Sequence, residues 1–275
     1  MRDRSTINSK SAIIRQVVTL VAIITAFGTN VWANINPVNG LTIGEISQNI
    51  FGNVLITPAS YAFIIWGLIY LGLISFAIYQ ALPAQKGDSL LHKIGYKIAI
   101  ASIAQIIWVF CFLYRQYGAS MIAMLCILLP LIGAYLSLPF KTRISRWHRW
   151  LVRTPISIYL AWISIATVLN GALLLDSWQW SGWGISAPIW TVIMLLIAGS
   201  IAHFVTLPRL DFAYAGVFVW GAIAIAIKNW NTVLIPGNSD ALPVSVISGT
   251  AIGLSISLIL LLLSFSFHKQ SDRTS

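Results

Sequence analysis

Three aromatic or amide side chains occur at helical spacing within an otherwise apolar stretch of this chain, residues 153–176. Tyr159, Trp162 and Asn170 are three and then eight positions apart, so at 3.6 residues per turn they share one face of a helix. An amide in hydrocarbon costs free energy unless it finds a partner, so Asn170 should face protein or a ligand. Such a face can bind a ligand, or it can hold a helix bundle together through a structural hydrogen bond.

Two other apolar stretches carry similar faces. One presents Phe63, Trp66 and Tyr70, and the other presents Gln105 and Trp108. Aromatic stripes usually serve packing, but rings can also stack on a flat apolar molecule while indole, phenol and amide groups orient it. The sequence therefore predicts a ligand site formed by Phe63, Trp66, Tyr70, Gln105, Trp108, Tyr159, Trp162 and Asn170.

Metal and nucleophilic chemistry find no support in the sequence. The only two cysteines, Cys111 and Cys126, lie in apolar runs without CxxC spacing, so we expect no metal site. His203 is alone in its apolar run, where a hydrogen bond to a neighbouring helix is more common than metal ligation. Nothing resembles an acid–base pair or a nucleophile with its base, so we expect neither enzyme activity nor a required cofactor.

Membrane-spanning helices must position these residues. Apolar residues make up 58% of the 275 residues and charged residues only 9%, whereas charged residues are roughly a quarter of a soluble protein. The apolar runs are long and lack the alternation of barrel strands, so we expect an all-α, polytopic transmembrane bundle. About eight spans fit, near residues 12–33, 58–82, 97–114, 119–138, 152–175, 187–207, 212–227 and 243–267.

The net charge of +10 reflects topology and does not indicate a nucleic-acid partner. Eight spans put both termini on one side, and of the 17 Lys and Arg residues only Arg115 and Lys228 fall on the other. We therefore expect a multi-pass protein of the cell membrane, in contact with lipid, with both termini in the cytoplasm. Charged residues such as Arg15 lie near span ends, where their side chains can extend to the headgroups. A cleaved secretory signal is the alternative for the first span, whose long apolar run favours retention.

Two of these helices resemble a known family. The stretch from Tyr159 to Asn170 reads YLAWISIATVLN and is very similar to the fifth-helix motif of the translocator protein, or tryptophan-rich sensory protein, family. Gln105 and Trp108 resemble the Asn-x-x-Trp of that family's third helix. The similarity covers about residues 12–176, with five spans in the family's order.

A loop and the helix after it resemble the family's second-helix region. The family motif is Trp-Thr-Pro-Pro-Gly-Trp with a downstream Trp and Tyr, and here residues 57–61 read TPASY, followed by Trp66 and Tyr70. Ile56 stands where the motif has its first Trp, so the loop is the part of the resemblance that departs most.

The resemblance implies a five-helix bundle, commonly dimeric, that binds porphyrin or haem. We therefore expect residues 1–176 to form a translocator-protein-like membrane domain and residues 177–275 to form an additional three-helix membrane segment packed on it. The implied function is that of a receptor or sensor for a flat hydrophobic ligand such as a porphyrin or haem-type tetrapyrrole. The alternatives are a transporter or permease for a hydrophobic metabolite and, as the resemblance also suggests, light-dependent porphyrin oxidation.

Overall fold

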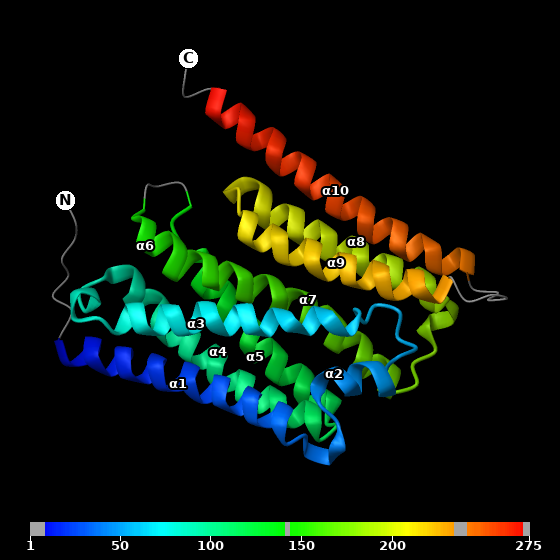
Figure 1. Ribbon diagram of the computed structural model, residues 1–275, viewed down its shortest axis with the longest axis horizontal. Coiled ribbons are helices and arrows are strands. Elements are labelled where there is room, and N and C mark those ends of the chain that lie inside the picture. The colour runs from blue at the N-terminus through cyan, green and yellow to red at the C-terminus, as the bar shows by residue number, and fades with distance from the viewer. Residues whose placement is uncertain (1–8, 141–143, 234–240, 272–275) are drawn as a thin grey trace. The chain divides into compact units, whose positions relative to one another are not determined.

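The computed structural model describes residues 9–140, 144–233 and 241–271, and within them every regular element is a helix (Figure 1). This confirms the predicted all-α bundle. Eight helical stretches in the described residues are long and apolar enough to cross a membrane, as predicted. They are Lys10–Ile35, Ser60–Ala81, Ser89–Leu113, Tyr117–Leu136, Arg146–Ser177, Ala187–Arg209, Phe212–Trp230 and Val244–Phe267.

The third span begins at Ser89 rather than near residue 97. Its helix starts there because the side chain of Asp88 caps it: Asp88 Oδ1 accepts hydrogen bonds from the backbone N–H groups of Leu90 (2.9 Å) and Leu91 (3.0 Å). The first two turns contain polar residues such as Lys93, so they precede the apolar run on which the sequence prediction rests.

The chain packs as two compact units. Among the described residues, the first unit contains the chain up to Ile43 and Ile65–Ile163, and the second contains Gly44–Ile64 and the chain from Ser164 onward. Helix α7 (Thr154–Ser177) therefore contributes to both units. The expected boundary between two membrane segments after Asp176 stays a prediction. It rests on the family resemblance, whereas these two units are defined by packing within the chain.

In the first unit, the long helix α4 packs against both α1 and α5, and α3 packs against α1 (Figure 1). A π-helical turn before α7 contacts α3. These elements are α1 (Ser9–Ile35), α3 (Ile65–Ala81), α4 (Ser89–Leu113), α5 (Tyr117–Leu136), the short helix α6 (Arg146–His148) and the π-helical turn Arg149–Arg153. Together with the start of α7, they form the scaffold for the aromatic residues of the predicted site.

The second unit contains three further long helices, α8 (Ala187–Thr206), α9 (Phe212–Val233) and α10 (Ala241–Ser271), each of which packs against the other two. The segment from Gly44 to Ile64 joins them through short helical turns. These include the end of α2 (Ile43–Glu45), a π-helical turn (Ile46–Ile50) and a 3₁₀ turn (Ser60–Ile64) that contacts α9.

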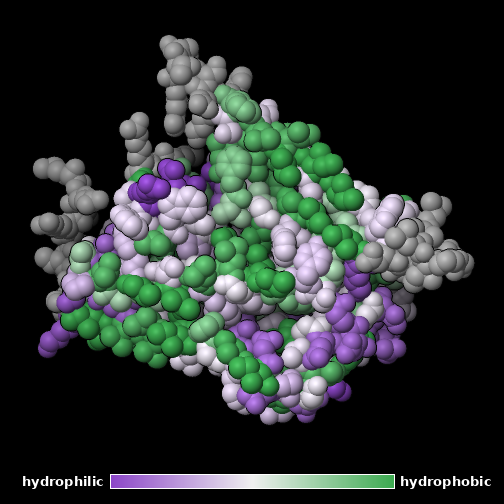
Figure 2. All heavy atoms as spheres, in the orientation of Figure 1, coloured by the Kyte–Doolittle hydropathy of each residue, from purple (hydrophilic) through white to green (hydrophobic). Residues whose placement is uncertain are grey.

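The outward faces of the helices are apolar, as lipid requires. Figure 2 shows hydrophobic side chains along α1 and α10. Large aliphatic side chains are exposed there, among them Ile14, Val21, Ile256 and Leu260. Exposed apolar area of this extent is unfavourable in water and favourable against lipid tails, which supports a membrane location.

Arg15 is buried instead of reaching outward from its span end. Its side chain is 0% exposed, because α1 packs on α4 at Gly95. A Cβ added to Gly95 would lie 3.0 Å from both Cγ and Cδ of Arg15, so a larger residue there would require the Arg15 stem to shift. Among the described residues, none of the three side-chain nitrogens of Arg15 has a hydrogen-bond acceptor.

Candidate functional site

Trp66 on α3 lies at the centre of a buried aromatic cluster in the first unit. Its ring centroid is 5.7 Å from that of Tyr70, 6.4 Å from Trp108, 6.3 Å from Tyr159 and 6.5 Å from Trp162. The rings of Tyr70 and Trp66 are stacked, whereas the rings of Tyr159 and Trp162 meet Trp66 edge-on. All five side chains are buried. Three stripes that the sequence placed on separate helices therefore meet at one indole.

Polar atoms border this cluster. The hydroxyl of Tyr159 donates to Gln105 Oε1 at 3.4 Å, and the hydroxyl of Tyr70 donates to the backbone oxygen of Ala26 on α1 at 3.3 Å. Gln105 Nε2 is buried and has no acceptor among the described residues, although Gln105 is only 1% exposed. A buried amide donor left without an acceptor costs about 1–3 kcal/mol, so it favours any bound group that offers one.

Two predicted residues belong to the second unit. Phe63 is half-buried in the 3₁₀ turn before α3, close to Gly44. Asn170 is buried on the later part of α7. The structure thus gathers Trp66, Tyr70, Gln105, Trp108, Tyr159 and Trp162 into one cluster, and the participation of Phe63 and Asn170 in it stays a prediction.

Two further rings join the cluster beyond the predicted site residues. Phe27 on α1 has its ring centroid 5.2 Å from that of Tyr70. Phe112, one turn after Trp108, stacks on Trp108 at 5.2 Å. Phe112 lies four positions after Trp108, so helical spacing places it on the face of Gln105 and Trp108. Phe27 gives no such signal, because the other ring of α1, Trp32, is five positions away and lies on a different face.

Metal-ligating side chains do not gather in the described residues, where no group of three or more His, Cys, Asp or Glu could hold an ion. His203 Nδ1 bonds to the backbone oxygen of Gly199 (2.7 Å), and its Nε2 bonds to Ser257 Oγ on α10 (3.3 Å). The expected hydrogen bond from His203 to a neighbouring helix is therefore confirmed.

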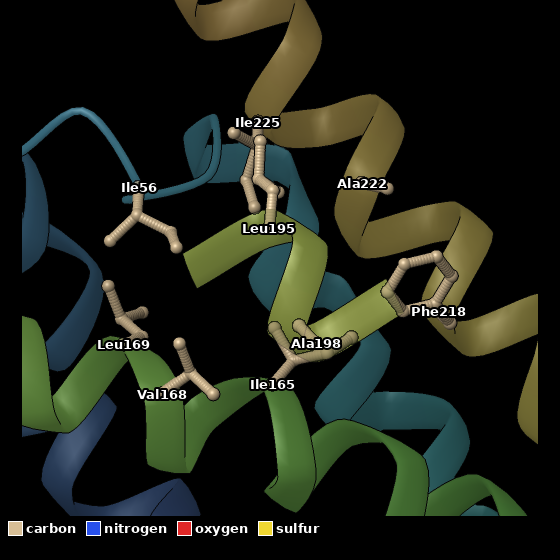
Figure 3. A pocket seen from close by; sticks show the side chains of 9 residues that line it. All are labelled: Ile56, Ile165, Val168, Leu169, Leu195, Ala198, Phe218, Ala222 and Ile225. Carbon is tan, nitrogen blue, oxygen red and sulfur yellow. The ribbon is translucent and has the colours of Figure 1, made fainter. Parts of the chain in front are cut away.

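A small apolar cavity of about 20 Å³ lies in the second unit (Figure 3). It is bordered by Ile56 of the loop, by α7 at Ile165 and Leu169, by α8 at Leu195 and by α9 at Phe218. The volume is enough for about one water molecule, but the apolar lining offers that water no partners, so we expect it to stay dry.

Comparison with known proteins places the chain in a family context. A family model described as TSPO-like protein matches residues 16–264. The match agrees with the resemblance seen in the sequence but extends further, since it reaches all eight spans, including the three that follow Asp176. No curated protein and no solved structure matches the chain.

Proposed function

This chain belongs to the TSPO-like protein family, and from that premise we propose that it is a receptor or sensor that binds a porphyrin or haem-type tetrapyrrole. It is an integral, multi-pass membrane protein. The distribution of Lys and Arg supports an orientation with both termini in the cytoplasm. In this proposal the ligand is bound without chemical conversion, because the residues of the cluster do not include an acid–base pair or a nucleophile with its base.

One observation carries this proposal: four aromatic rings from α3, α4 and α7 surround that of Trp66 in a buried position. Rings in both stacked and edge-on orientations offer faces and edges to a flat π-system. Because these rings already touch one another, the tetrapyrrole enters when Trp66 moves away from Trp108 and Trp162. The displaced ring contacts are replaced by contacts with the ligand.

The buried amide of Gln105 gives the ligand its orientation. A tetrapyrrole carries ring nitrogens and carboxylates that accept hydrogen bonds, and Nε2 of Gln105 is a donor that lacks an acceptor in the described residues. Pairing of this donor on binding removes the desolvation penalty that the free protein carries.

Titration of protoporphyrin IX into the protein in lipid nanodiscs, followed by quenching of tryptophan fluorescence, tests the proposal. Wild-type quenching should be saturable. Trp162→Leu should weaken affinity roughly tenfold, the equivalent of one strong aromatic contact. Trp147→Leu, which removes a solvent-exposed tryptophan on α6, is the matched control and should bind as wild type does.

Gln105→Leu separates a ligand contact from a packing role. Leu has a similar size and removes the unpaired donor, but it also removes the acceptor of the buried Tyr159 hydroxyl, so the two effects on stability oppose each other. The variant should therefore unfold near the wild-type temperature and yet bind protoporphyrin more weakly. Unchanged affinity in both Trp162→Leu and Gln105→Leu would show that the cluster only packs the bundle.

A further inference from the structure

A larger pocket lies entirely within the second unit and shares no residue with the aromatic cluster. Its volume is about 200 Å³. Its walls come from the loop at residues 53–56, the end of α7, the connection that follows α7 and the first turns of α8. The TSPO-like proposal above makes no use of this pocket.

The lining of this pocket combines one acid with two indoles. Asp176, at the end of α7, is the only charged side chain among the lining residues. Trp180 and Trp190 also line the pocket, with ring centroids 5.1 Å apart. The other walls are mostly aliphatic, for example Leu175 and Met194. An indole face attracts a cation, and a nearby carboxylate adds to that attraction.

The connection that follows α7 holds Trp190 in place at the cost of backbone strain. Gln179 (φ 53°) and Trp183 (φ 54°) have left-handed backbones without being glycine, and Gly182 (φ 68°) and Gly184 (φ 79°) are also left-handed. Trp190 Nε1 donates to the backbone oxygen of Gly182 at 2.9 Å. Non-glycine residues in this region cost of order 1–3 kcal/mol each and persist mainly at functional sites.

The wall formed by residues 53–56 is also held in place, by hydrogen bonds from α9. Lys228 on α9 donates to Thr57 Oγ1 and to the backbone oxygen of Val54 (3.2 Å), and Asn229 Nδ2 donates to the backbone oxygen of Leu55 (2.9 Å). Because hydrogen bonds hold both of these walls, few side chains and loops must become ordered when a ligand binds, which favours affinity. Ile56 lines both this pocket and the small apolar cavity of Figure 3, so the pocket borders further apolar space.

We propose that this pocket binds an amphipathic organic cation of the quaternary ammonium class. The charged head lies against Trp180 and Trp190 beside Asp176, and the apolar body lies toward Ile56. The head is either that of a soluble cation or the choline headgroup of a lipid, since both present the same trimethylammonium group. The inference stands independently of tetrapyrrole binding.

Equilibrium dialysis of radiolabelled benzyltrimethylammonium against the protein in phosphatidylglycerol nanodiscs tests this site, with empty nanodiscs as the blank. Wild type should bind saturably, and Asp176→Asn and Trp180→Leu should each weaken binding roughly tenfold. Two matched controls should bind as wild type does. Glu45→Gln neutralises another exposed acid of the second unit, and Trp178→Leu removes an exposed tryptophan outside the pocket lining.

The same measurement in phosphatidylcholine nanodiscs distinguishes the source of the cation. Loss of radioligand binding there identifies the lipid headgroup as the occupant, and retained binding identifies a soluble cation. The proposal is overturned if wild type binds no better than Asp176→Asn. It is also overturned if the neutral isostere, with carbon in place of the ammonium nitrogen, competes equally well.

Discussion

Replacement of Asp88 by Ala should destabilise the first unit by about 2 kcal/mol, because its carboxylate both caps helix α4 and accepts a hydrogen bond from His148. Asp88 Oδ1 accepts hydrogen bonds from the backbone of Leu90 and Leu91 and so caps α4. Asp88 Oδ2 accepts a hydrogen bond from His148 Nε2 at 2.9 Å. Since His148 is in α6, the same side chain ties the start of α4 to the segment that leads into α7.

The two contributions can be separated by a second variant. Loss of an N-cap acceptor costs about 1 kcal/mol. The contact between His148 Nε2 and Asp88 Oδ2 is a part-buried hydrogen bond, and an ion pair when His148 is protonated, and its loss costs about 1 kcal/mol. Asp88→Asn keeps a good cap and removes the charge, so it should cost about half as much as Asp88→Ala.

The pKa of Asp88 sets the pH range of this effect. Burial acts to raise it, but hydrogen bonds from His148 and from the backbone of Leu91 and Leu90, with the charge of His148, hold the pKa below its ordinary value. A carboxyl whose folded pKa is lowered adds stability above its unfolded pKa, about 4, and loses it as pH falls through the folded value. Wild type and Asp88→Asn should therefore converge as pH falls below about 4.

Unfolding in mixed micelles, with increasing fractions of dodecyl sulfate and far-ultraviolet circular dichroism as the readout, measures these differences. Asp176→Asn, which changes an exposed acid, is the control and should stay within about 0.5 kcal/mol of wild type. An equal decrease of the unfolding free energy in Asp88→Asn and Asp88→Ala would refute the division between the helix cap and the contact with His148. Wild-type stability in both would refute the role of Asp88 altogether.

Two further predictions concern close packing in the first unit. Arg15→Met should raise the free energy of unfolding by about 1–4 kcal/mol in the same micelle titration, because it replaces a buried guanidinium that lacks acceptors in the described residues. A lower free energy of unfolding would mean that the charge of Arg15 is paired. In thermal unfolding, the Gly72→Ala variant should be less stable than the Gly67→Ala variant by about 1–3 kcal/mol. A Cβ at Gly72 would lie 3.1 Å from Pro155 Cβ, whereas no atom lies within 4 Å of a Cβ at Gly67. Equal stability of the two glycine variants would contradict this packing.

The number of spans could be predicted because hydrocarbon demands long apolar helices, and this requirement is local in sequence. Helix starts were less predictable. The cap at Asp88 precedes polar turns that contain Lys93, and such turns carry no hydropathy signal. The burial of Arg15 could not be predicted either, because it depends on which face of α1 meets Gly95 of another helix.

The candidate site could likewise be predicted only in part from the sequence. Helical spacing correctly indicates that Gln105 and Trp108 share a face, but it does not say which helices meet. The convergence of rings on Trp66 is a property of tertiary packing. Phe27 joins the cluster for the same reason, through the packing of α1 against α3.

The most direct test of tetrapyrrole binding is the absorbance spectrum of protoporphyrin IX titrated with the wild-type protein in nanodiscs. The account predicts a saturable shift of the Soret band, because a porphyrin that stacks between Trp66, Trp108 and Trp162 leaves water and lipid for an aromatic environment. A spectrum identical to that obtained with empty nanodiscs, at every protein concentration, would contradict the account.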